Sequence, residues 1–184
     1  MVRNLVTTAL GPREMRQQQP LALFYADHRL VWPGGSARAA AGRGGVRTDK
    51  REGDGATPAG TYPLLSAMYR ADRLAPPVTE LPLTAIRRDH VWIDDPAAAD
   101  YNRLALLPCA VRHEVLWRDD GLYDLLVVIG YNMTPQVAGA GSAIFLHVAG
   151  PDFAATEGCI AVTRETLNEV VGLLRPGSTI TIRA

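Results

Sequence analysis

The chain consists largely of short apolar runs, each bounded by glycine, proline, asparagine or aspartate. Apolar runs of roughly four to eight residues between turn-forming residues are typical of β-strands, because a helix needs a longer segment with a 3.6-residue period. The pattern therefore predicts a mainly β fold. The strand candidates are LALFYADHRLVW (21–32, two strands around a turn at Asp27 and His28), TYPLLSAMY (61–69), HVWI (90–93), SAIFLHV (142–148) and STITIR (178–183).

A further hairpin is predicted around Asp119-Asp120-Gly121, which is a tight-turn signal. These residues separate the apolar runs VRHEVLWR (111–118) and LYDLLVVIGYN (122–132). Two strands joined by so short a turn usually pair with each other, and we expect these two to do so.

One helix is indicated near the C-terminus, where apolar residues recur at helical spacing and form a stripe that can face a core. A threonine can cap its start, and a Pro-Gly pair ends it. Several strands with one clear helix favour a sandwich or barrel, and we expect a β-sandwich with a few edge helices in one domain, residues 1–184. The helix residues are Thr163 for the cap, Leu167, Val170, Val171 and Leu174 for the stripe, and Pro176 and Gly177 for the end.

Charge and hydropathy limit the partners. The formal net charge is zero, which argues against nucleic acid as a partner. No apolar run approaches the roughly 18 residues of a membrane span, so no membrane insertion is expected. The segment MVRNLVTTALGPREMRQQQP (1–20) lacks the apolar stretch of a secretory signal. Either the chain is not exported by that route, or its signal lies outside this sequence.

The segment HVAGPDFAATEGCIAV (147–162) holds the residue types of a cysteine–histidine site. Gly158 before Cys159 lets the backbone approach a substrate closely, so that N–H groups can face a developing oxyanion. His147 ends an apolar strand. If the chain folds back, His147 can reach Cys159, lower the pKa of its thiol and act as its base. The alternative is a buried, inert thiol and a structural histidine.

The other reactive residues support weaker alternatives. Cys109 lies in an apolar run without a flanking glycine, and a redox pair of Cys109 with Cys159 forms no CxxC motif. Asp94 and Asp95 point to opposite faces of a strand, which disfavours a glycosidase. The cysteines and histidines show no metal-ligand spacing.

Two motifs occur in order along the chain: REGDGATPAGTYPL (51–64) and IFLHVAG…TEGCIAV (144–162). The second resembles the active-site segment of the L,D-transpeptidase (YkuD) family, in which a strand histidine, a loop and Ser/Thr-x-Gly-Cys build the site. The first resembles an upstream segment of that family, and LVVIGYN also fits. The likeness runs from about position 40 to the C-terminus. The matching upstream residues are Asp54, Thr57, Pro58 and Gly60.

The resemblance implies a role for each motif residue. Cys159 matches the nucleophile, His147 the general base, and Thr156 the Ser/Thr of the motif. The backbone of Gly158 and Cys159 matches the oxyanion hole. The resemblance also implies that no metal or organic cofactor is needed. Peptidoglycan stem peptides and glycan strands are the implied partners, and the periplasm is the implied location.

The sequence departs from the family pattern around the cysteine. Glu157 stands where members typically have histidine, and Ala161 stands where they have arginine or asparagine. The loop from His147 to Cys159 is also short. These positions surround the donor stem peptide, which implies altered donor recognition. They resemble a divergent branch that links stems through their first residue (1-3) rather than their third (3-3).

The implied reaction begins with attack of the Cys159 thiolate on a stem-peptide carbonyl next to an L-centre. The resulting thioester passes to the side-chain amine of a diaminopimelate in a second stem. Water as the attacking group would make the protein an L,D-carboxypeptidase or endopeptidase. A non-catalytic wall-binding module with an unreactive Cys159 is a further alternative.

Further residues are candidates for binding substrate. Tyr131 and Asn132 end the strand expected beside the histidine strand, where they bind the donor or simply form a turn. Tyr69, Arg70 and Arg73 precede the proline segment and could meet carboxylates or glycan, although surface arginines are usually just solvated. The predicted substrate-binding set is Thr156, Glu157, Tyr131, Asn132, Tyr69, Arg70 and Arg73.

The segment DRLAPPVTELPLTAI (72–86) contains three prolines that cannot donate ladder hydrogen bonds, so it is predicted to be an ordered irregular loop. We expect this loop to narrow access to the thiol; the alternative is a simple surface connection.

Overall fold

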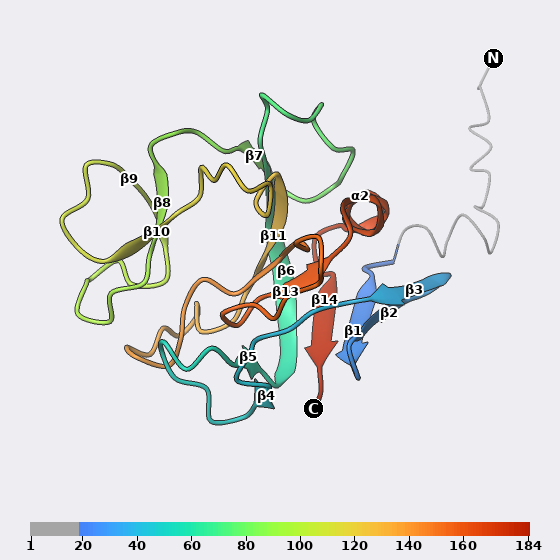
Figure 1. Ribbon diagram of the computed structural model, residues 1–184, viewed down its shortest axis with the longest axis horizontal. Coiled ribbons are helices and arrows are strands. Elements are labelled where there is room, and N and C mark those ends of the chain that lie inside the picture. Colours follow the sequence, from blue (N-terminus) through green and yellow to red (C-terminus); the bar gives the residue numbers. More distant parts are fainter. Residues whose placement is uncertain (1–18) are drawn as a thin grey trace, which may run out of the picture.

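The computed structural model describes residues 19–184 (Figure 1). Nearly all of the segment assessed for a secretory signal lies outside the described residues. The described chain contains fourteen strands and one helix. They are β1 (Ala22–Ala26), β2 (Arg29–Trp32), β3 (Gly35–Arg38), β4 (Val46–Arg47), β5 (Thr57–Pro58), β6 (Gly60–Tyr69), β7 (Leu83–Ala85), β8 (His90–Ile93), β9 (Leu104–Leu106), β10 (His113–Val115), β11 (Leu125–Ile129), β12 (Phe145–Val148), β13 (Ile160–Val162), α2 (Arg164–Leu173) and β14 (Thr179–Ile182).

Strand β6 connects the two halves of the main sheet. The order in this nine-stranded sheet is β13-β12-β11-β6-β14-β1-β2-β3, with β7 also on β6. The part of β6 from Leu64 to Tyr69 pairs with β11, and the part from Gly60 to Pro63 pairs with β14. The register shifts between Val128 and Ile129, where β6 changes partner. Irregularities of this kind bend a strand, so one long strand can serve two halves of a folded sheet.

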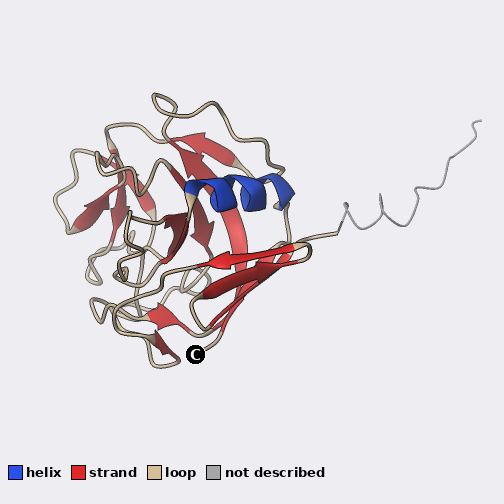
Figure 2. Cartoon of the chain, turned by 45° about the vertical axis from the view of Figure 1, so that its right-hand side comes forward, coloured by secondary structure: helices blue, strands red, loops and turns tan. Residues whose placement is uncertain are grey.

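The main core lies between these halves. Leu30 and Ile180 from one half, and Leu146 and Ile160 from the other, are fully buried in one cluster. Helix α2 packs onto the same cluster (Figure 2). This arrangement confirms the predicted mainly β sandwich. Within residues 19–184 it carries one helix rather than several edge helices.

The predicted helix is confirmed in detail. Thr163 caps it, because its Oγ1 accepts a hydrogen bond from the Thr166 amide at 3.2 Å. Leu167, Val170 and Val171 are completely buried, as the apolar stripe predicts. The strand candidates at 21–32, 61–69, 90–93, 142–148 and 178–183 are confirmed as well.

The predicted hairpin around residues 119–121 is wrong. Strand β10 pairs with β8, whereas β11 pairs with β6 and β12. All five residues of β11 are buried. Such a strand needs apolar covering on both faces, and β11 has it only inside the main sheet, with the main core on one face and the three-stranded sheet on the other. The turn signal is real, but it separates two different sheets.

The separate sheet has the order β10-β8-β9 and covers the outer face of β11 and β12. Buried Asn102 joins this sheet to the main one. Its Oδ1 accepts from Trp92 Nε1 at 2.9 Å and from the Ala143 amide at 3.1 Å. Its Nδ2 donates to the carbonyls of Tyr131 and Asn132 at 3.0 and 2.9 Å. All hydrogen-bonding capacity of the side chain is therefore used, and three of the four bonds cross to the loops of the main sheet.

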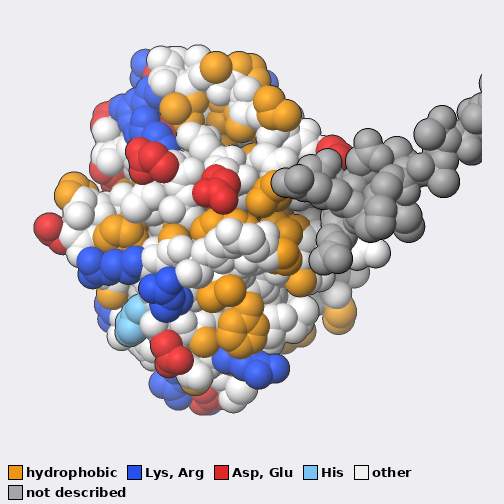
Figure 3. All heavy atoms as spheres, turned by 90° about the vertical axis from the view of Figure 1, so that its right-hand side faces the viewer, with side chains coloured by type: hydrophobic (Ala, Val, Ile, Leu, Met, Phe, Trp, Pro, Cys, Tyr) orange, Lys and Arg blue, Asp and Glu red, His pale blue; other side chains and the backbone are white. Residues whose placement is uncertain are grey.

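Charges of both signs lie side by side on the face shown in Figure 3, in keeping with the net charge of zero. No helix within the described residues is long and apolar enough to cross a membrane.

Candidate active site

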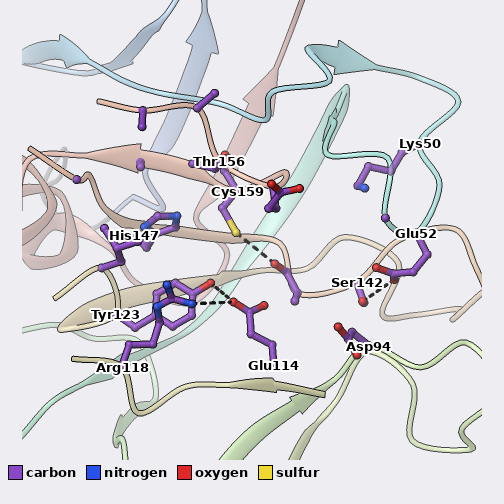
Figure 4. Close-up of a pocket in the computed structure, with 18 of the residues that line it drawn as sticks. Lys50, Glu52, Asp94, Glu114, Arg118, Tyr123, Ser142, His147, Thr156 and Cys159 are labelled. Carbon is purple, nitrogen blue, oxygen red and sulfur yellow. Dashed lines mark hydrogen bonds and ion pairs between the residues drawn. The ribbon is translucent and has the colours of Figure 1, made fainter. Parts of the chain in front are cut away.

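A cavity of about 480 Å³ lies between the main sheet and the three-stranded sheet. This volume falls within the roughly 300–1,000 Å³ typical of ligand pockets. The main sheet contributes His147 and Cys159, the loop before β13 contributes Thr156 and Glu157, and β10 contributes Glu114 (Figure 4). Four of the residues singled out from the sequence thus meet at one cavity.

Parallel pairing of β12 with β13 brings the histidine and the cysteine to one face. Leu146 is in register with Ile160, and His147 with Ala161. Side chains alternate along a strand, so His147 and Ala161 share a face of the sheet. Cys159 is two residues before Ala161 and therefore points the same way. The twelve-residue spacing is bridged by the loop that connects the two strands.

The Cys159 thiol is buried among backbone groups at the base of the cavity. Its Sγ donates to the Ala143 carbonyl at 3.2 Å and accepts from the Phe145 amide at 3.3 Å. Burial, followed by the nearby Glu114 carboxylate, raises the pKa of the thiol to about 12. The thiol is therefore protonated at neutral pH in the free protein.

His147 is also buried, with 4% of its surface exposed. Its Nδ1 lies 2.8 Å from the Val148 carbonyl. A carbonyl can only accept, so Nδ1 carries the proton and Nε2 is the basic nitrogen. Burial lowers the pKa of His147 to about 4, and the ring is therefore neutral at physiological pH.

The lowered pKa of His147 makes the protein less stable in acid. Above about pH 6.5 the residue is neutral in both the folded and the unfolded chain. Between about pH 6.5 and 4 the unfolded chain binds a proton that the folded chain rejects, which costs about 3 kcal/mol of unfolding free energy. Urea unfolding across this range should show the loss in wild type, and a smaller loss in His147→Asn. Equal acid sensitivity of both proteins would contradict this assignment.

Gly158 forms a tight turn before the cysteine. Its φ is +138°, and a Cβ there would lie 2.8 Å from the Ala56 carbonyl oxygen. Thr156 holds the turn closed: its Oγ1 donates to the Cys159 carbonyl at 2.6 Å and accepts from the Gly158 amide at 3.1 Å. A residue without a side chain is therefore required at position 158.

Replacing Gly158 by alanine should lower the unfolding free energy by about 2 kcal/mol, because the residue is strained and its Cβ meets backbone. Gly139→Ala is the matched control. Gly139 also has positive φ, but a Cβ there meets nothing within 4 Å. Urea unfolding should show the larger loss for Gly158→Ala. Equal losses would mean that the contact with Ala56 has no cost.

The upstream motif, residues 51–64, positions the backbone against which this turn packs. Asp54 accepts hydrogen bonds from the Ala56 amide at 2.8 Å and from Lys50 Nζ at 2.7 Å. Oγ1 of the buried Thr57 accepts a hydrogen bond from the Gly42 amide at 2.8 Å. These contacts fix the backbone of Ala56, on which Gly158 rests. The two motifs, about a hundred residues apart in sequence, thus form one structural unit.

Sequence reasoning missed Glu114, Tyr123 and Arg118, which line the cavity beside the thiol. Tyr123 Oη donates to Glu114, and its ring packs edge-on against His147 with a centroid distance of 5.3 Å. Arg118 lies over the Tyr123 ring at 5.1 Å. Glu114 and Tyr123 come from runs that were wrongly paired as a hairpin. Only a carboxylate within the otherwise apolar run EVLW could have drawn attention to Glu114.

Five predicted substrate-binding residues do not line the cavity within the described structure. Asn132 uses its amide to close its own loop, donating to the carbonyls of Val137 and Gly141 and accepting the Val137 amide. Tyr131 Oη donates to the Ala140 carbonyl. Both residues therefore shape a loop.

The other three lie at the end of β6. Tyr69 is buried in the main core. Arg70 is 2% exposed, pairs with Asp72 and lies over the Trp117 ring at 3.6 Å. Arg73 pairs with Asp124 at 2.8 Å. All three have contacts that account for their presence without substrate.

The proline segment does not narrow the cavity. It packs at the end of α2, where the Glu80 amide donates to the Leu174 carbonyl at 3.2 Å and Val78 approaches Gly172. None of residues 72–86 lines the cavity. The wall opposite the thiol comes from the three-stranded sheet instead. The expectation was wrong because it placed the segment by composition alone.

Both cysteines are free in the described chain, and each thiol donates to a different backbone carbonyl. No group of three or more potential metal-ligating side chains occurs among residues 19–184.

A comparison with protein-family models matches residues 16–182 to YkuD, the L,D-transpeptidase catalytic domain. Among solved structures, the chain is similar to L,D-transpeptidase 1 of Mycobacterium tuberculosis, with 14% identity and a TM-score of 0.43. The match covers 89% of this chain and 59% of that one. No curated protein matched the sequence.

The fold and the match over nearly the whole chain define a catalytic-domain class, that of the L,D-transpeptidases. The chain belongs to the YkuD family.

Proposed function

We propose that this domain is a cysteine-dependent L,D-transpeptidase that crosslinks peptidoglycan stem peptides through a thioester on Cys159. The observation that carries the proposal is the placing of Cys159 and His147 on one face of a cavity, next to the Gly158 turn. Its departures from the family pattern favour a 1-3 linkage. A cell-wall substrate favours the periplasm as the location of the protein.

The first half-reaction forms the thioester. Cys159 Sγ attacks the stem carbonyl, and His147 Nε2 takes the thiol proton and passes it to the leaving amine. The Gly158 amide already donates to Thr156, so the Cys159 amide is the principal donor to the oxyanion. Thiol and imidazole both start uncharged, since burial opposes charge on either. The proton therefore leaves as the carbon–sulfur bond forms.

The second half-reaction transfers the acyl group. An amine of a second stem attacks the thioester carbonyl, and the sulfur leaves as the new amide forms. The sulfur recovers its proton through His147. Hydrolysis by water is the competing outcome, and the walls that both sheets give the cavity favour the amine once it is bound.

The test is incubation with disaccharide-tripeptide and disaccharide-tetrapeptide muropeptides, read by mass spectrometry with fragmentation. Wild type should give a crosslinked dimer through a protein adduct on Cys159. Cys159→Ala should give neither, and Cys109→Ala, which removes the other thiol, should behave as wild type. The fragments assign the bond as 1-3 or 3-3.

Other outcomes point to the alternatives. Shortened stems without dimers would identify a carboxypeptidase or endopeptidase. Unchanged muropeptides with every folded variant would contradict catalysis and leave a wall-binding module. The buried, protonated thiol is the observation that keeps this second candidate under consideration.

A further inference from the structure

Four carboxylates line the cavity, and two of them are neutralised by arginines. Asp94 pairs with Arg112 at 3.1 Å. Glu157 pairs with Arg43 at 2.9 Å, and hydrogen bonding to Arg43 lowers the pKa of Glu157. These two acids already have cationic partners, so neither needs a ligand to balance its charge.

A third carboxylate, Glu52, is occupied by hydroxyl groups. Its Oε2 accepts from Ser142 at 2.6 Å and also from Tyr101. Arg112 lies 3.9 Å from its other oxygen. Glu52 thus serves to tie the loop at residues 141–142 to the three-stranded sheet.

Glu114, the fourth, has no cation in close contact among the described residues. Arg118 approaches it only to 4.0 Å, and that guanidinium is engaged by Asp120 through Nε at 3.1 Å. Tyr123 Oη donates to Oε1, which leaves Oε2 for a ligand. The side chain is 27% exposed, and it lines the cavity. Burial raises the pKa of Glu114, as expected for a charge without a counter-ion.

The position of Glu114 works against the nucleophile in the free protein. Glu114 and Tyr123 lie on one side of the Cys159 thiol, and Thr156 lies on the other (Figure 4). The carboxylate is the charged group that most raises the pKa of the thiol after burial itself. Without the Glu114 carboxylate the pKa of the thiol would be lower, and the thiolate would form more readily. A cation bound to Glu114 would remove this penalty.

We infer that Glu114 binds the ammonium group of the acceptor amine and takes its first proton, as a catalytic residue of the second half-reaction. The inference rests on the proposed function. Of the four cavity carboxylates, Glu114 has the least compensated charge and stands beside Tyr123, which also packs on His147. An ammonium held there shares the cavity with the Cys159 thiol, on which the Glu114 charge acts.

The protons balance. The acceptor ammonium gives one proton to Glu114 and becomes a nucleophilic amine. Its nitrogen bonds to the thioester carbonyl carbon, and the carbon–sulfur bond breaks. The second proton passes through His147 to the Cys159 sulfur, and the third stays on the new amide. Glu114 then returns its proton to solvent.

The test compares Glu114→Gln with wild type in two separate steps. Glutamine keeps an oxygen to accept from Tyr123, so the packing survives. Thioester formation with donor muropeptide should remain within a few-fold of wild type. The ratio of transfer to an amine acceptor over hydrolysis of the same thioester should fall at least about 10-fold. The KM for the acceptor should rise. Glu169→Gln, on the exposed face of α2, is the control.

A second readout does not depend on turnover. The titratable and charged groups that line the cavity with the thiol are Lys50, Glu52, Asp94, Arg112, Glu114, Arg118, Tyr123, His147 and Glu157. Iodoacetamide alkylation of Cys159 should reach its half-maximal rate at lower pH in Glu114→Gln, because a negative charge is gone. Diaminopimelate should accelerate alkylation of wild type at fixed pH, but not of the variant.

The two measurements distinguish failure of the proposed function from failure of the inference about Glu114. If wild type forms no thioester, the proposed function fails, and the effect of diaminopimelate on alkylation alone decides the role of Glu114. If the thioester forms and Glu114→Gln partitions between amine and water as wild type does, the inference is overturned.

Discussion

His147→Asn should slow thioester formation by roughly 100- to 10,000-fold, the range expected when a general base is removed. Asparagine places an amide N–H where histidine has Nδ1, so the hydrogen bond to the Val148 carbonyl is kept. What is lost is Nε2, the basic nitrogen. Because the Cys159 thiol has a pKa raised to about 12, very little thiolate forms without a base.

The measurement is the rate of adduct formation between donor muropeptide and Cys159, followed by mass spectrometry, together with thermal melts. His28→Asn is the control, since His28 lies in an exposed turn at φ +58°, which asparagine accepts. A folded His147→Asn protein that reacts within threefold of wild type would exclude His147 as the base.

Asn102→Ala should lower the unfolding free energy by about 3 kcal/mol or more. The change leaves the Trp92 indole N–H and the Ala143 amide without their acceptor, and each buried unsatisfied donor costs about 1–3 kcal/mol. The carbonyls of Tyr131 and Asn132 lose their donor as well. The change thus removes four hydrogen bonds, three of which join the segment of the three-stranded sheet to the main sheet.

Urea unfolding of Asn102→Ala and of Asn168→Ala tests this. Asn168 is exposed on α2, so its replacement should change stability by less than about 0.5 kcal/mol. Asn102→Ala should also speed alkylation of Cys159, since Ala143, whose carbonyl holds the thiol, is no longer fixed. Loss of less than 1 kcal/mol would show that water replaces the amide at little cost.

Local pattern predicted the local elements. The stripe of Leu167, Val170 and Val171 specifies a helix wherever it packs, and the apolar run before His147 specifies a buried strand. Partner choice was not predictable. Strands β6, β11 and β12 are all apolar, and nothing in their composition tells which lie side by side. The hairpin prediction failed for that reason.

The residues of the candidate site also fall into two groups, those that a sequence motif reveals and those that only the packing of strands brings together. Cys159, His147 and Thr156 lie within one short segment, so a sequence motif reveals them. Glu114 reaches the thiol only because a second sheet covers the first, and Tyr123 only because β11 pairs with β12. Arg70 and Arg73 show the opposite case. Their charges suggested substrate contact, but ion pairs with aspartates account for them.

The separation of the two sheets has a consequence for how such a domain can diversify. The nucleophile, its base and the glycine turn all belong to the main sheet and its loops, whereas Asp94, Arg112 and Glu114 belong to the segment between β7 and β11. That segment is held to the main sheet by side-chain contacts, namely apolar packing such as that of Trp92 on Phe145 and the hydrogen bonds of Asn102. Substitutions in the segment between β7 and β11 can therefore change which acceptor the cavity binds, while the cysteine, the histidine and the glycine turn stay the same.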